Sequence, residues 1–159
     1  MTATSSTFNI WENDDFQRAQ QWVLYEMSER TWREFVAAHR GKYGERAFNR
    51  VGAFYNRIGY LVTRHLLGGN DQLELDTVAG TAIAIWKKIE PLVLEARLIE
   101  NSTLFQDFQR MLPECYSCYV PSQPVPPAIR QGAELAAQLS QEDAMHPRHD
   151  NARCWYHCE

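Results

Sequence analysis

The stretch from Val51 to Arg97 constrains the fold more than any other part of the chain. Apolar residues recur along it at intervals of three and four, the spacing that places side chains on one buried face of an α-helix. Gly68 and Gly69 interrupt the pattern, and glycine commonly ends a helix because it adopts left-handed backbone angles without penalty. Two amphipathic helices joined by a short break are therefore predicted here.

The same spacing predicts helices along most of the chain. Asn13 or Asp14 is expected to cap the first helix, and Ser28 or Thr31 the second. Pro91 is expected to end one helix and to begin the next, because proline is tolerated in a first helical turn. The predicted helices cover approximately residues 14–27, 32–40, 44–67, 77–90, 91–99, 103–112 and 128–140.

No segment shows the alternation of apolar and polar residues that is typical of a half-buried strand. The sequence therefore predicts an all-α fold, a compact antiparallel bundle of about five to six helices. Five of the seven prolines fall between residues 113 and 127, and proline is unfavourable inside a helix. We therefore expect a helical bundle domain over residues 1–112. Residues 113–159 are expected to form a proline-rich linker, a short helix and a tail with cysteine and histidine residues.

Composition narrows the possible locations and partners. A chain of 159 residues can bury a core without a metal ion or a disulfide bond. The net charge of −4 argues against nucleic-acid binding, which usually requires a basic excess. The N-terminal residues lack the features of a secretory signal, and no apolar run is long enough for a membrane span. A cytoplasmic protein with no membrane span and no nucleic-acid partner is therefore expected.

Part of this pattern resembles a known family. The segments FYNRIGYLVTRHLL and DTVAGTAIAIWKKIEPLVLEAR, followed by LFQDFQRML, are similar to the family known as domain of unknown function 4760. The resemblance covers roughly residues 47–112. It implies a compact helical domain without an established activity, and it supplies no catalytic residue. The residues that carry it are Phe54, Tyr55, Asn56, Ile58, Gly59, Leu61, Val62, Gly80, Trp86, Pro91 and Arg97.

Three arginines form the first candidate site. Arg50, Arg57 and Arg64 are spaced seven residues apart, so they line one side of the longest predicted helix, with Arg46 one turn earlier. Such a stripe can bind an acidic protein partner, a nucleic acid or a lipid. It can also be an ordinary solvated face, whose arginines form ion pairs with nearby acidic residues. The acidic candidates are Asp14, Asp15, Glu26, Glu29 and Glu34.

Glycines and a histidine on the same helix have structural interpretations. Gly52 and Gly59 are expected to permit close packing against the N-terminal helix or the helix that carries Trp86, since glycine costs a helix about 1 kcal/mol relative to alanine. A ligand slot is the alternative. His65 is expected to pack on the apolar face with a hydrogen bond to a carbonyl group.

The four cysteines form the second candidate site. Cys115 and Cys118 make a C-x-x-C pair, and Cys154 and Cys158 follow near the C-terminus, with His146 and His157 as possible substitutes. Two short-spaced pairs can supply the four ligands of a tetrahedral zinc site. The spacing of the two pairs does not match a compact zinc ribbon. Free thiols and a redox pair remain open.

No catalytic constellation is found in the sequence. The leading hypothesis is therefore a non-catalytic helical protein that binds another protein, without a cofactor and not an enzyme. The alternative is a small regulatory protein that binds zinc through its four cysteines. A third hypothesis is an anion-binding protein that uses Arg50, Arg57 and Arg64.

Overall fold

The computed structural model describes residues 10–11, 13–66 and 71–145, with side chains described over 10–11, 13–66 and 75–139. Within these residues all regular secondary structure is helical, which confirms the predicted all-α bundle of five to six helices. The elements are α2 (Asp14–Gln21), a π-helical turn η1 (Trp22–Glu26), α3 (Trp32–His39), α4 (Tyr43–Thr63), α5 (Asp71–Ile99), α6 (Gln106–Tyr119) and α7 (Pro127–Met145).

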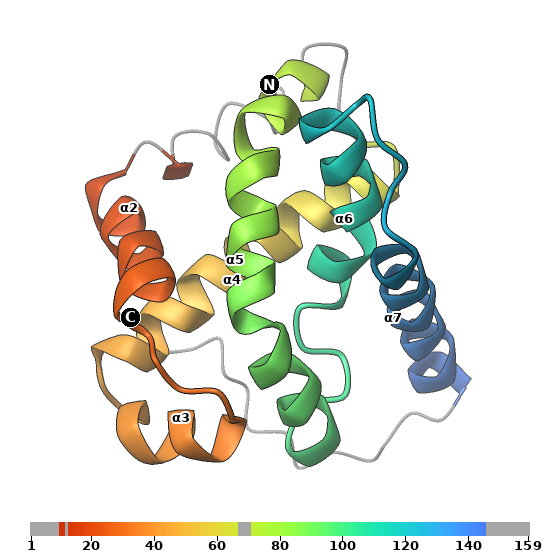
Figure 1. Cartoon of the computed structure of the whole chain (residues 1–159). Helices are drawn as coiled ribbons and strands as arrows, with labels where there is room; N and C mark the ends of the chain where they lie inside the picture. The colour runs from red at the N-terminus through yellow and green to blue at the C-terminus, as the bar shows by residue number, and fades with distance from the viewer. Residues whose placement is uncertain (1–9, 12, 67–70, 146–159) are drawn as a thin grey trace.

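Helix α6 is the centre of the bundle, because α4, α5 and α7 all pack against it. Helices α2 and α3 lie at the opposite side of Figure 1 from α7, and α4 crosses behind α5 in this view. Aromatic rings from separate helices fill the core between them. Tyr55 of α4 stacks on Phe108 of α6, with ring centroids 4.9 Å apart, and Trp86 of α5 meets the same phenylalanine edge-on.

The predicted helix starts in the N-terminal part are confirmed. The side chain of Asn13 accepts hydrogen bonds from the first turn of α2, and that of Thr31 accepts one from Glu34 in α3. These caps satisfy backbone N–H groups that have no partner within the helix. Gly41 follows α3 with a φ of 74°, the left-handed conformation that favours glycine.

Helix α5 contradicts the predicted break at Pro91. It runs for 29 residues through this proline. Pro91 is exposed, whereas Ile89, Leu92 and Val93 on either side are buried. Burial continues on one face across the proline, and this packing outweighs the loss of about 3 kcal/mol that an interior proline causes. The two helices predicted on either side of Pro91 are therefore a single helix.

Helix α6 contradicts the predicted linker at Pro113 in the same way. The helix begins at Gln106, later than predicted, and continues through Pro113 to Tyr119. Leu112 and Cys115 are buried on either side of the proline, so the apolar face is continuous across it. The boundary predicted after residue 112 therefore falls inside a helix. Between α6 and α7 the segment without helix covers residues 120–126, and α7 then begins close to its predicted start.

Candidate functional site

The buried face of α4 approaches α6 at two glycines. A methyl group added at Gly59 would lie 2.0 Å from the carbonyl oxygen of Asp107, and one added at Gly52 would lie 2.1 Å from the ring of Phe105. Close packing was correctly predicted for both glycines, and no ligand slot is formed. The predicted neighbours were wrong, because the glycines face the start of α6 and not the N-terminal helix or the Trp86 helix.

The opposite face of α4 is exposed along its whole length. Apart from Asn49, its exposed positions follow one another at alternating steps of three and four residues, and we call this row the α4 seam. It contains no acidic residue and no aliphatic side chain larger than alanine. The α4 seam consists of Tyr43, Arg46, Arg50, Ala53, Arg57, Tyr60 and Arg64, the last of which caps the helix. The three predicted site arginines therefore share one exposed surface.

The ion pairs predicted for these arginines are not formed with the expected acids. Arg64 pairs with Asp107, with Nη1 3.4 Å from Oδ1. Among the described residues, no ion pair is found for Arg50 or Arg57. Glu45, the acidic residue within α4, lies off the seam and pairs with Arg40. Most of the positive charge on the α4 seam is therefore not compensated by an acidic residue in the described part of the chain.

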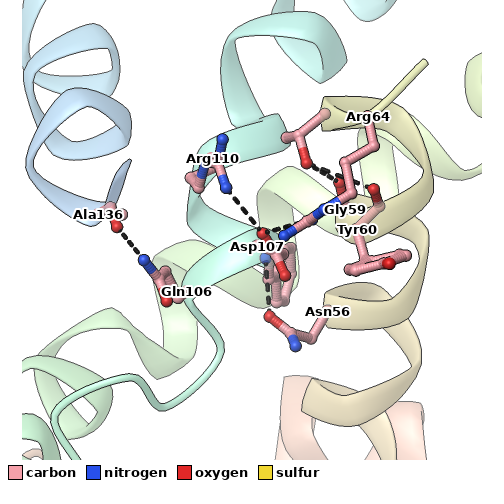
Figure 2. A network of polar contacts seen from close by, with 10 residues as sticks. Asn56, Gly59, Tyr60, Arg64, Gln106, Asp107, Arg110 and Ala136 are labelled. Atoms are coloured by element: carbon pink, nitrogen blue, oxygen red, sulfur yellow. Dashed lines mark hydrogen bonds and ion pairs between the residues drawn. The ribbon is translucent and has the colours of Figure 1, made fainter. Parts of the chain in front are cut away.

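Among the described residues, a polar network holds the C-terminal end of the seam (Figure 2). The guanidinium of Arg64 lies 3.9 Å from the ring centroid of Tyr60, a cation–π contact. The carboxylate of Asp107 accepts hydrogen bonds from both Arg64 and Arg110. Asn56 Oδ1 accepts a hydrogen bond from the backbone N–H of Phe108 at 3.0 Å, so α4 supplies a capping group for the first turn of α6.

His65 lies just beyond this network, and its predicted burial is wrong. The residue is exposed and has a φ of 53°. Helix α4 ends at Thr63, so His65 is not on the buried face of the helix. The chain turns at His65 through the left-handed region. His65 therefore marks the end of the helix and is not part of its packed face.

The cysteine pair in the described chain is divided between the core and its edge. Cys115 is fully buried in α6, and Cys118 is half-buried one turn later. Burial raises the pKa of the Cys115 thiol to about 12, with the nearby Cys118 and Glu114 adding to the effect. A zinc ion requires the thiolate, so this environment opposes ligation by Cys115. Cys154, Cys158, His146 and His157 lie outside the described residues.

A second pair of titratable groups joins the α2–α3 connection to the end of α3. His39 Nε2 lies 2.9 Å from Glu29 Oε1. Burial alone would raise the pKa of the Glu29 carboxyl, but hydrogen bonds from backbone N–H groups and from His39 outweigh burial and lower it. The pair therefore stabilises the fold above the usual pKa of glutamate, and this stabilisation is lost as the pH falls. We assign it a structural role.

Two residues of the family resemblance also have structural roles. Trp86 is buried and donates a hydrogen bond to Glu90. Arg97 joins α5 to the start of α6, because its guanidinium donates to the carbonyl of Leu104 at 2.9 Å and to Gln109 Oε1 at 2.6 Å. Burial lowers the pKa of Arg97 to about 10, and the charge of Glu90 opposes this shift.

The predicted site residues omitted part of the seam. Tyr43, Ala53 and Tyr60 complete it, and Asp107 pairs with its last arginine. The alternating steps of three and four were visible in the sequence and could have identified the first three. The ion pair between Asp107 and Arg64 could not be predicted from the sequence, because the packing of α6 on α4 alone brings the two side chains together.

No protein-family model matches this chain, and neither the curated proteins nor the solved structures contain a significant match. The resemblance to domain of unknown function 4760 therefore stays a prediction.

Within residues 10–11, 13–66 and 75–139, no three histidine, cysteine or acidic side chains lie together as a metal site would require. The helices described here include none with the length and apolar character needed to cross a membrane.

Proposed function

We propose that this chain is a non-catalytic protein-binding module and that it binds its partner through the α4 seam. The observation that carries the proposal is the exposed row of four arginines and two tyrosines on one helix, without acidic residues among them. Arginine and tyrosine are enriched at the centres of protein interfaces, where they combine hydrogen bonding with a large contact area.

The distribution of charge supports a protein partner over a nucleic acid. The chain carries 20 acidic and 16 basic residues, yet α4 and its cap carry four arginines against Glu45. The net negative charge of the whole chain repels a long polyanion, whereas a short acidic segment can contact the seam alone. The seam therefore suits a partner that contacts one helix of this protein.

The energetics of the seam support binding over a role in the fold. Exposed ion pairs contribute about 0–1 kcal/mol, and Arg50 and Arg57 form none with described residues. Arginine side chains also cover neighbouring apolar surface, but the core beneath the seam is already closed by Phe48, Val51 and Tyr55. The fold therefore has little need of these two arginines.

Site-specific photocrosslinking in cells tests the proposal. A photoreactive phenylalanine analogue replaces Ala53, in the middle of the seam, and in a matched protein it replaces the exposed Ala84 of α5. We expect a discrete adduct with a second protein from position 53 only. Adding Arg50→Glu and Arg57→Glu should remove this adduct. Equal adducts from positions 53 and 84, or none from position 53, would contradict the proposed function.

A further inference from the structure

The positions of the α4 seam follow the spacing of a coiled coil. From Tyr43 to Arg64 the steps alternate between three and four residues without interruption. This is the a and d spacing of a heptad repeat, which keeps a row of side chains facing a second helix. Arg50, Arg57 and Arg64 occupy equivalent positions in successive heptads, and Ala53 and Tyr60 occupy the intervening ones.

From this register we infer that the α4 seam binds a single acidic α-helix of a partner protein, laid along α4, with carboxylates spaced seven residues apart. The inference rests on the proposed function and adds the shape and chemistry of the bound segment. The seam extends over about 32 Å, since its 22 residues rise about 1.5 Å each, so three heptads of partner helix can follow it.

The side chains of the seam define what the partner helix presents. Neighbouring arginines of the heptad row stand about 10 Å apart along the axis, which matches the repeat of glutamates on a facing helix. Ala53 is the one small side chain between them and leaves room for a larger apolar residue of the partner. Tyr43 and Tyr60 are 41% and 44% exposed and offer ring surface at both ends of the row.

Other anionic occupants fit this register less well. Insertion into a membrane surface requires several large apolar side chains on the same face as the basic residues, whereas the seam has no large aliphatic side chain and only the rings of Tyr43 and Tyr60. Proteins usually bind nucleic-acid backbones through a broad basic surface. The α4 seam is a single row of basic residues, and the acidic residues Asp107 and Glu45 border it. The aligned, acid-free row along one helix favours a helical partner.

Titration with designed helical peptides tests the inference. The test peptide has about three heptads, with glutamate at the first position of each heptad, leucine at the fourth, alanine and glutamine elsewhere and a side-chain staple to maintain the helix. The control peptide has the same composition and staple, but its glutamates are distributed around the helix. We expect saturable binding of the test peptide and binding at least about tenfold weaker for the control.

Variants of the full chain assign the binding to the seam. Arg50→Gln with Arg57→Gln should weaken test-peptide binding about tenfold. Arg33→Gln with Lys87→Gln removes the same charge from exposed positions on α3 and α5 and should leave binding unchanged. Raising the salt concentration should weaken binding to the unaltered chain more than binding to the Arg50→Gln/Arg57→Gln variant, which keeps only Arg46 and Arg64 on the seam.

Three outcomes overturn the inference. These are equal binding of both peptides, equal loss in both double variants, and tighter seam-dependent binding of a single-stranded oligonucleotide or of anionic phosphatidylserine vesicles than of the test peptide. The photocrosslink at position 53 separates this inference from the proposed function. If the adduct with a protein forms and depends on Arg50 and Arg57 while the peptides fail, the seam binds a protein that is not an acidic helix.

Discussion

The two faces of α4 differ in what they contribute to the protein. The inner face contacts α6 so closely that Gly52 and Gly59 leave no room for a methyl group, and it carries the buried Tyr55. The outer face carries Arg50 and Arg57 in solvent, without ion pairs to described residues. One helix therefore separates the residues that stabilise the fold from those available for binding.

The largest effect on stability is expected at the closest contact of the inner face. Gly59→Ala forces the backbone of α6 to shift at Asp107, and overpacking of this kind should cost about 3 kcal/mol. Urea denaturation measures the loss. Helix propensity alone predicts the opposite sign, a gain of about 1 kcal/mol. A stabilised Gly59→Ala protein would show that the contact with α6 is not tight. Asn49→Ala, on the exposed side, is the matched control.

A smaller loss is expected from the buried hydrogen bond of the inner face. The hydroxyl of Tyr55 donates to Gln20 Oε1 at 2.6 Å, and both residues are buried. Tyr55→Phe leaves the glutamine oxygen without this donor, which should lower the free energy of unfolding by about 2 kcal/mol. Adding Gln20→Met should recover much of the loss, because neither polar group then remains. No recovery would mean that the tyrosine hydroxyl acts through a different contact.

Asn56 lies at the border between the two faces and should have an intermediate effect. Asn56→Ala removes the acceptor for the Phe108 N–H in the first turn of α6, and loss of a helix cap of this kind costs about 1 kcal/mol. Thermal unfolding measures the change, and Asn56→Asp is the control that keeps an acceptor oxygen. Equal stability of both variants and the unaltered chain would remove Asn56 from the α4–α6 contact.

The smallest single effect is expected where the outer face meets α6. Arg64 is 40% exposed and pairs with Asp107 at 3.4 Å. Arg64→Gln should therefore cost only about 0.5 kcal/mol, and less in high salt. A double-mutant cycle with Asp107→Asn isolates the pair. A coupling energy as large as the effect of Tyr55→Phe would mean that the outer face also supports the fold.

The helices of this fold were largely predictable, because periodicity and capping are local properties of a sequence. Asn13 and Thr31 mark helix starts as predicted. Pro91 and Pro113 misled the prediction, since their local cost is outweighed by buried residues on both sides. That balance depends on which surfaces the other helices cover, and no local rule contains this information.

The candidate site was predictable in part for the same reason. The seven-residue spacing placed Arg50, Arg57 and Arg64 on one side of a helix, and the structure shows that this side is exposed. The acidic partners predicted for these arginines all lie in the N-terminal part of the chain, and this prediction was wrong. Asp107 was the partner of Arg64 instead, and it is 43 residues away in the sequence. Tertiary packing alone brings such a pair together.

The separation between the two faces is tested most directly by one variant measured in two ways. For Arg50→Gln with Arg57→Gln, we would determine the free energy of unfolding and the affinity for the acidic heptad peptide in the same buffer. The account predicts stability within about 0.5 kcal/mol of the unaltered chain, together with an affinity about tenfold lower. A loss of stability comparable to that of Gly59→Ala, with unchanged affinity, would contradict it.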